Sequence, residues 1–229
     1  MEKHGFTWVS ALHLPVPENT ATAVLVAILL GLVAWRVRGK LRDTNAALEP
    51  DDGVSVRNAG EVLVEGIDAL AEGVIGHHHR QYVPLLAAFF VFILVSNLVG
   101  LVPGVLPPTS NFSTTLGLGL VSFVAYNAYG LKAHGLAYLK HFLGPVAFLA
   151  AFMLPIELFS HAFRPISLGI RLFANLFADH AVVGIFTELT KVGIPVMFYV
   201  LGAFVSVVQA FVFTMLSAIY IALAVSHDH

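Results

Sequence analysis

One charged residue lies in the middle of a strongly apolar part of this chain. Arg171 belongs to the run Ser167-Leu-Gly-Ile-Arg-Leu-Phe-Ala-Asn175, and no carboxylate in that stretch is closer than Asp179. A charged side chain at membrane depth costs about 2.5 to 3.5 kcal/mol even on a lenient insertion scale, unless it faces a polar cavity or a partner charge. Arg171 is therefore expected to have a function, and its counter-charge should come from elsewhere in the protein or from another subunit.

Other polar residues share the helix face of Arg171. At 100° per residue, five of them project within about 40° of it on an ideal helix: Glu157, Ser160, Arg164, Ser167 and Asn175. A face that is polar over several turns cannot face lipid. Asp179 lies about 80° round the helix, and His180 points to roughly the opposite side. A simpler interpretation stays open for two of these residues, in which Arg164 reaches a lipid headgroup and Glu157 pairs with it.

The last apolar segment supplies small and polar residues on one helix side. Gly202, Ser206 and Gln209 are spaced by four and three residues, so they lie along the same side. Small residues let helices approach closely, and glutamine can hydrogen-bond across a helix pair, so packing alone and a specific partner for Gln209 both stay open. No phosphate-binding glycine loop, nucleophile elbow or zinc-ligand pair stands out, and no cofactor or metal is expected. The pattern favours proton or ion movement over bond-making chemistry.

The composition indicates an integral membrane protein. Of the 229 residues, 58% are hydrophobic and only 11% are charged, against about 25% charged in an average soluble domain. Apolar blocks of about 20 residues recur, the length that a helix needs to cross hydrocarbon. The chain has no cysteine, which excludes disulfides and thiolate chemistry. Its net charge of -2 gives no indication of a nucleic-acid partner, and none is expected.

The elements that position these residues are predicted to form an all-α integral membrane protein, with about five membrane-spanning helices and one amphipathic interfacial helix. In chain order, the prediction for a single membrane domain over 1–229 is an outside tail (1–19), a first span (20–35), an amphipathic helix (54–76), hairpin spans (82–102 and 116–131) and two long helices (145–187 and 192–225). The basic cluster after the first span should stay cytoplasmic, which places the N-terminus outside. The first long helix must tilt strongly, bend at Pro155 or Pro165, or extend beyond the bilayer, and strong tilt is expected for both long helices.

The segment 54–76 has the pattern of an amphipathic helix. Its four acidic residues share one face at spacings of three and four: Glu61, Glu65, Asp68 and Glu72. This helix is expected to lie along the cytoplasmic membrane surface. The run His77-His78-His79 follows it, lacks the other ligands of a metal site, and is expected to be solvated at the interface.

Three stretches of the chain carry a resemblance to a known family. They are Pro155-Ile-Glu-Leu-Phe-Ser160, Arg164-Pro-Ile-Ser-Leu-Gly-Ile-Arg171-Leu-Phe-Ala-Asn175 and Gln209-Ala-Phe-Val-Phe. They closely resemble the a subunit of F-type ATP synthases, and the resemblance covers nearly the whole chain. It implies a stator against which a ring of c subunits rotates, with two offset aqueous half-channels that lead protons to and from the ring carboxylates. It also implies further partners and a place: the b subunits of the peripheral stalk, indirectly the soluble catalytic head, membrane lipids, and the cell (inner) membrane with a cytoplasmic C-terminus.

The resemblance assigns roles to Arg171 and two amides. Arg171 matches the arginine that faces the ring carboxylate, favours its ionised state and blocks a proton short circuit between the half-channels. This agrees with elementary electrostatics, because a fixed cation lowers the pKa of a nearby acid and repels a hydrated proton. Asn175 and Gln209 match the amides that flank this arginine.

The resemblance also assigns residues to the two half-channels. Glu157 and Ser160 match the half-channel on the cytoplasmic side, and His180 matches the titratable group of the other one. An imidazole, with an ordinary pKa near 6.5, suits proton relay. The chain departs from the family pattern where many relatives have glycine and it has Asp179, and where some have His or Glu and it has Gly202. We expect Asp179 to supply a carboxylate beside His180 in place of that partner.

Alternative functions are weighed against this interpretation. A sodium-driven version of the same machine stays open, because ion choice should reside mostly in the ring. An independent secondary transporter is the main alternative from another class, although the sequence has no internal repeat. A purely structural membrane anchor would leave a charged residue in a polar stripe unexplained.

Overall fold

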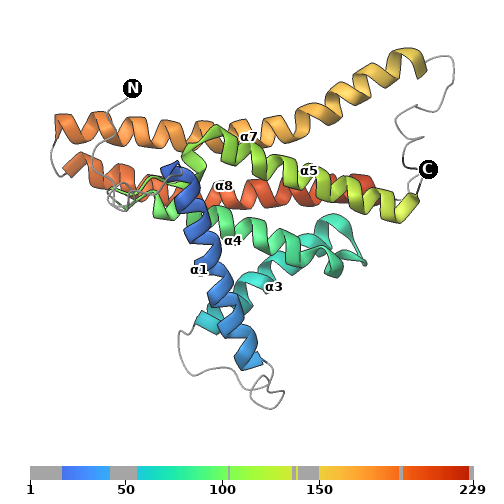
Figure 1. Ribbon diagram of the computed structural model, residues 1–229, viewed down its shortest axis with the longest axis horizontal. Coiled ribbons are helices and arrows are strands. Elements are labelled where there is room, and N and C mark those ends of the chain that lie inside the picture. The colour runs from blue at the N-terminus through green and yellow to red at the C-terminus, as the bar shows by residue number, and fades with distance from the viewer. Residues whose placement is uncertain are drawn as a thin grey trace. The chain divides into compact units, whose positions relative to one another are not determined.

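The computed structural model describes residues 17–41, 56–102, 104–135, 138, 150–190 and 193–226, and this part of the chain is all-helical, as predicted (Figure 1). Its elements are α1 (Glu18–Leu41), α3 (Val56–Ile75), the 3-10 turn η2 (His79–Gln81), α4 (Val83–Val99), the 3-10 turn η3 (Pro108–Ser110), α5 (Phe112–His134), α7 (Ala150–Leu189) and α8 (Gly193–Val225). The predicted tail before residue 17, the basic side chains after Arg36, and residues 145–149 of the first long helix lie outside the described part.

Three of these helices are long and apolar enough to cross a membrane. The spanning segments are Glu18–Arg36 within α1, Leu154–Thr187 within α7 and Gly193–Val225, which is all of α8. The helix α4 is strongly apolar but has 17 residues, and α5 has 23 residues that include several Ser, Thr, Gly and Asn. The membrane all-α class is confirmed, and the total of five spans stays a prediction.

The chain divides into two compact units, which are described separately. The first unit comprises the chain up to Pro108 together with Gly202–Thr214, and the second comprises Thr109–Leu201 together with the chain from Met215 onward. The helix α8 therefore contributes its middle to the first unit and its two ends to the second.

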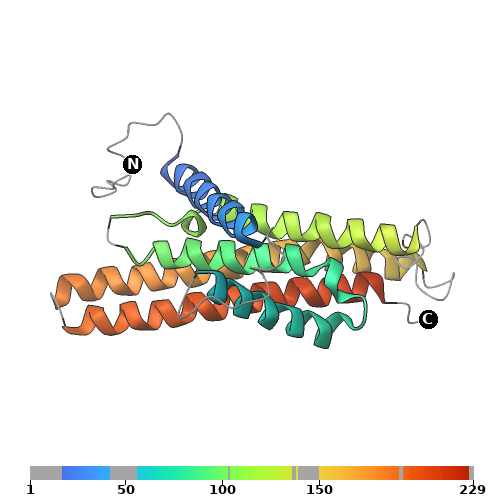
Figure 2. The ribbon, with the colours of Figure 1, turned by 90° about the horizontal axis from the view of Figure 1, so that it is seen from below.

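In the first unit, α1 and α3 both pack against α4, and α1 crosses α4 steeply in both views (Figures 1 and 2). The α3 helix is amphipathic, as predicted. Its apolar side, with Ile67 buried, borders a cavity of about 260 Å³ that α4 and α8 also line. Of its acidic side, Glu61, Glu65 and Glu72 are exposed and Asp68 is half-buried. The helix ends at Gly76, whose φ of 86° is a conformation that a side chain would strain.

The histidine run after α3 is only partly solvated. His77 and His78 are exposed, but His79 is buried, and its Nδ1 lies 2.9 Å from the carbonyl oxygen of Gly76. The Nε2 of His79 lies 3.0 Å from Oδ1 of Asp68. The expectation of interfacial solvation is therefore wrong for His79, because the turn at Gly76 brings its ring back onto α3.

In the second unit, α5 packs along α7 with unusually close backbones. A Cβ atom on Gly119 would lie 2.4 Å from the carbonyl oxygen of Pro165, and a Cβ on Gly169 would lie 2.9 Å from Cα of Leu116. Real Cβ atoms do not approach other atoms this closely, so both positions need glycine. The helix α5 begins four residues before the predicted span, because the side chain of Asn111 accepts a hydrogen bond from the backbone N–H of Ser113 at 2.9 Å and caps it.

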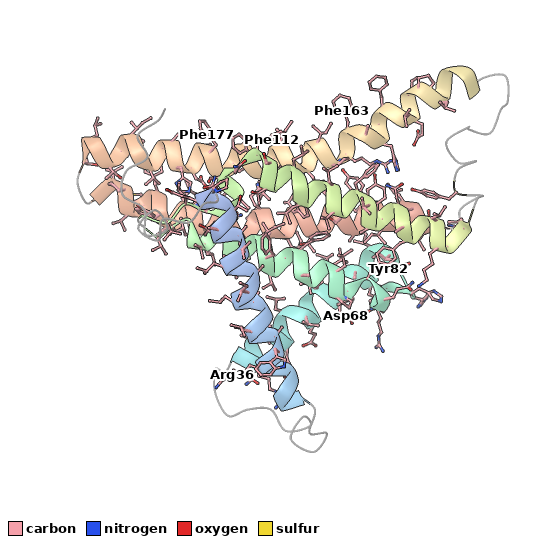
Figure 3. The ribbon with its side chains drawn as sticks, in the orientation of Figure 1. Arg36, Asp68, Tyr82, Phe112, Phe163 and Phe177 are labelled. Atoms are coloured by element: carbon pink, nitrogen blue, oxygen red, sulfur yellow. The ribbon has the colours of Figure 1, made fainter. Side chains whose placement is uncertain are left out.

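The helix α7 is continuous through Pro155 and Pro165, but it changes direction along its length. Its N-terminal part, which carries Phe163, rises away from the line of the C-terminal part, which carries Phe177 (Figure 3). Pro165 lies between these two markers, and a proline inside a helix removes one hydrogen bond and bends the axis. Of the three ways to accommodate this long segment, the structure thus contains a bend between Phe163 and Phe177, the interval that includes Pro165, while the tilt stays a prediction (Figure 3).

Candidate functional site

The helix α7 buries one side and exposes the polar stripe beside it. The buried side carries Leu168, Leu172 and Leu176, which are 3%, 1% and 6% exposed. The stripe runs along the adjacent side, with three exposed members and three half-buried ones: Ser160, Ser167 and Arg171, then Glu157, Arg164 and Asn175. The predicted stripe is therefore one continuous helix face that points out of this unit.

Arg171 forms no hydrogen bond or ion pair with any residue that the structure describes. Its surroundings on α7 are apolar and also open, since Ile170 is 48% exposed and Phe177 is 64% exposed. On the neighbouring turn, Phe173 packs against Phe112 of α5 and Phe177 (Figure 3). A cation among open apolar side chains in a membrane helix needs a polar cavity or a partner charge, and none of the described residues supplies that charge.

Arg164 has a different environment from Arg171. Its guanidinium carbon lies 5.3 Å from the centre of the Tyr220 ring, which is a cation–π geometry between α7 and the C-terminal end of α8. Among the described residues, Glu157 and Arg164 do not form an ion pair. The simpler interpretation, in which Glu157 pairs with Arg164, is therefore not what the structure contains.

The pair Asp179 and His180 lies one helical turn beyond Asn175. Asp179 is half-buried and His180 is exposed, and the two residues are neighbours in the sequence. Adjacent helix residues point about 100° apart, so the two side chains leave the helix in different directions. The relay expected of Asp179 and His180 therefore stays a prediction.

The site residues predicted on α8 lie in the first unit. Gly202 and Ser206 are buried, and the Ser206 hydroxyl donates to the Gly202 carbonyl at 2.8 Å. Gln209 is half-buried on the border of the same side. The small residues therefore belong to a packed helix face, as one of the two open interpretations has it.

Sequence reasoning missed several residues that the structure brings together. Gly119 and Gly169 set the α5–α7 distance, and Asn127 on α5 meets His161 on α7. The spacing of Thr115 and Gly119, small residues four apart, is a usual sign of a close helix contact and could have identified the first of these positions. Nothing in the local pattern indicates that Asn127 and His161 are partners.

No group of three or more His, Asp or Glu side chains within the described ranges could hold a metal ion. In the described part of the chain, the fold and the site define a class: a helical, multi-pass membrane protein in which α7 presents a polar stripe with an arginine that no described residue pairs with. A family model described as "ATP synthase A chain" matches residues 20–222. The chain belongs to this family, and it is a membrane (Fo) subunit that serves ATP synthesis and ion transport.

Curated relatives agree with this assignment. The chain is 47% identical over 208 residues to "ATP synthase subunit a" of Bdellovibrio bacteriovorus, covering 90% of each chain. It is 40% identical over 210 residues to "ATP synthase subunit a" of Trichlorobacter lovleyi, covering 92% of this chain and 86% of the relative. It is 37% identical over 225 residues to "ATP synthase subunit a 3" of Pelobacter propionicus, covering 96% and 94%.

Proposed function

We propose that this chain is the stator subunit of a rotary ATP synthase, in which Arg171 separates two offset aqueous half-channels that carry protons to and from the carboxylates of a c-subunit ring. The observation that supports this most directly is the environment of Arg171, an exposed cation in a membrane helix without a counter-charge among the described residues. A ring carboxylate would supply that charge. The same arginine would favour the ionised carboxylate and repel a hydrated proton.

Other site residues of α7 divide between the two half-channels. Glu157 and Ser160 serve the cytoplasmic side, and Asp179 with His180 serves the opposite side. Asn175 lies one turn after Arg171 on α7, and Gln209 of α8 has the role of the second amide that the family resemblance implies. The buried face of Gly202 and Ser206 holds α8 in place. Water inside each half-channel carries the proton up to these groups.

The proposed partners and orientation follow from this role. The exposed apolar side of α7, which includes Phe159 at 65% and Phe163 at 58%, is a surface for the ring or for lipid. The b subunits of the peripheral stalk hold the chain still, and the soluble head is coupled through the complex. The protein lies in the cell membrane with its N-terminus outside and its C-terminus in the cytoplasm.

Cysteine probing tests the aqueous half-channels, because the chain has no cysteine of its own. In membrane vesicles that carry the whole complex, we expect silver ions to inhibit ATP-driven proton uptake by the Ser160→Cys and Asn175→Cys variants. The reactive species is the thiolate, which forms in water and not in lipid. The measurement is proton uptake before and after silver.

The matched control is Phe159→Cys. Phe159 is next to Ser160 in the sequence, and its side chain lies on a different side of α7 from the stripe. Its proton uptake should be as insensitive to silver as that of the complex without an introduced cysteine. Equal inhibition of Ser160→Cys and Phe159→Cys would contradict a half-channel that follows the stripe.

A second test concerns Asp179 beside His180. Replacing Asp179 by Gly should lower proton transport by about tenfold or more while the complex still assembles, because a relay imidazole loses the carboxylate that orients it. Transport is measured as ATP-driven proton uptake, and assembly as the amount of the subunit retained in membranes. Ala178→Gly, which introduces the same flexible residue next door, should leave transport nearly unchanged. Full transport in the Asp179→Gly variant would remove Asp179 from the relay.

A further inference from the structure

A cluster of polar side chains in the second unit lies outside the site described so far. The Oδ1 atom of Asn127, on α5, accepts a hydrogen bond from the Tyr138 hydroxyl at 3.0 Å and lies 3.0 Å from Nε2 of His161 on α7. Tyr138 reaches this point because Gly130 leaves room, since a Cβ there would lie 2.7 Å from the tyrosine ring. The cluster joins α5 to the N-terminal part of α7.

The hydrogen-bond directions in this cluster follow from the backbone. Nδ2 of Asn127 donates to the carbonyl oxygen of Phe123 at 2.7 Å, and a flipped amide would set two acceptors against each other there. Oδ1 therefore faces His161, and Nε2 of His161 must carry the hydrogen that it donates. Two donors, Tyr138 and His161, thus converge on one acceptor. A proton cannot pass from one to the other through an amide oxygen, so the cluster holds position and does not conduct.

The ring of His161 is fixed on all sides. His161 is 7% exposed, and its ring makes edge-to-face contacts with Phe123 and Tyr126 at centroid distances of 5.4 and 5.2 Å. It lies one turn after Glu157 and one turn before Arg164 on the same helix. The fixed position of the His161 ring therefore sets the orientation, about the axis of α7, of the helical turn that carries Glu157 and Ser160.

The backbone of α7 loses one of its helix hydrogen bonds at this same residue. Pro165 has no N–H, so it cannot donate the helix hydrogen bond that the carbonyl of His161 would otherwise accept. The bend in α7 lies in the interval that includes this proline, and α5 contacts both sides of Pro165. On the C-terminal side, Gly169 meets Leu116, and on the N-terminal side, His161 meets Asn127.

We propose that His161 is a positioning residue of the proton path. By donating a hydrogen bond to Asn127, it holds the part of α7 before Pro165 against α5. This contact keeps Glu157 and Ser160 on the same helix face as Arg171. This inference rests on the proposed half-channel function. His161 acts through the orientation of its neighbours and does not itself carry the transported proton. A glutamine, whose amide N–H can take the place of Nε2–H, should therefore substitute for it.

The experiment uses the whole complex in vesicles and compares His161→Gln with His161→Leu. We expect His161→Leu to lower ATP-driven proton uptake by about two- to tenfold, the range of one lost hydrogen bond. His161→Gln should restore uptake with an unchanged pH profile. In the His161→Leu background, the rate at which silver inhibits Ser160→Cys should change. The rate for Asn175→Cys, which lies beyond the bend, should stay the same as without His161→Leu. Asn127→Leu should cause a smaller loss in the His161→Leu background than in the otherwise unchanged complex, because the bond that the two residues share is already absent there and only the other bonds of Asn127 are newly lost.

Other results would overturn this inference. A His161→Gln variant as impaired as His161→Leu, or with a shifted pH profile, would mean that the imidazole itself handles protons. If silver inhibits Ser160→Cys at the same rate with and without His161→Leu, the hydrogen bond of His161 does not set the orientation of the turn that carries Ser160. If silver never acts on Ser160→Cys or Asn175→Cys in the otherwise unchanged complex, the half-channel proposal itself fails, which separates the two failures.

Discussion

Replacing Arg171 by alanine should abolish ATP-driven proton pumping while the complex still assembles. At about 4 Å and an effective dielectric constant of about 20, a charge pair is worth about 4 kcal/mol, which changes the ionisation equilibrium of a facing carboxylate by about a thousandfold. Without the cation, that carboxylate keeps its proton as it passes between the half-channels. The same change removes the barrier between them, so passive proton leak should rise when the soluble head is stripped from the vesicles.

The measurement is vesicle acidification driven by ATP, followed by leak after removal of the head. Arg164→Ala is the matched control, because Arg164 lies in the same stripe but packs over Tyr220 and is expected to cause a smaller loss. Arg171→Lys keeps the positive charge but loses the planar set of N–H donors of the guanidinium group. It should therefore block pumping and cause less proton leak than Arg171→Ala. Retained pumping in Arg171→Ala would exclude Arg171 as the barrier, and with it the proposed mechanism.

The second large effect is expected from adding one methyl group at Gly119. Its Cβ would lie 2.4 Å from the carbonyl oxygen of Pro165, so Gly119→Ala must push α5 away from α7. Overpacking of this kind costs about 1 to 3 kcal/mol, and it acts at the bend that α5 supports. We expect a lower thermal denaturation midpoint of the purified complex in detergent and less of the subunit in membranes.

Gly117 provides a control two residues away on the same helix. A Cβ there meets no atom within 4 Å, and alanine is the better helix former by up to about 1 kcal/mol. Gly117→Ala should therefore leave stability unchanged or raise it, opposite in sign to Gly119→Ala. Equal behaviour of the two variants would argue against the close contact at Gly119.

Much of the site was predictable because it lies on one helix. The angular spacing of residues along α7 is a local property, so the stripe from Glu157 to Asn175 could be derived from the sequence, and the structure has these residues on one face. The family resemblance was carried by the same stretch and is confirmed by the relatives. The roles of the stripe residues stay predictions, since they depend on the proposed ring, which other chains would form.

The errors and omissions arose where the chain returns on itself. His79 was expected to be solvated, but the turn at Gly76 brings it beside Asp68, and both partners looked like ordinary surface residues. The bend of α7 was one of three open alternatives. A proline in the sequence predicts where a helix hydrogen bond is missing, but it does not indicate which neighbouring helix packs against that position.

By itself, the sequence determined the membrane class, the helical segments and the polar face around Arg171, because composition, segment length and helical periodicity are all local. Only the tertiary structure decided which helices touch and where. The hydrogen bond of His161 with Asn127 joins residues 34 apart, and that of Ser122 with Ser217 joins residues 95 apart at 2.9 Å. The first pair forms where Gly119 and Gly169 let the backbones of α5 and α7 approach, and no local pattern encodes which distant side chain such an approach brings into reach.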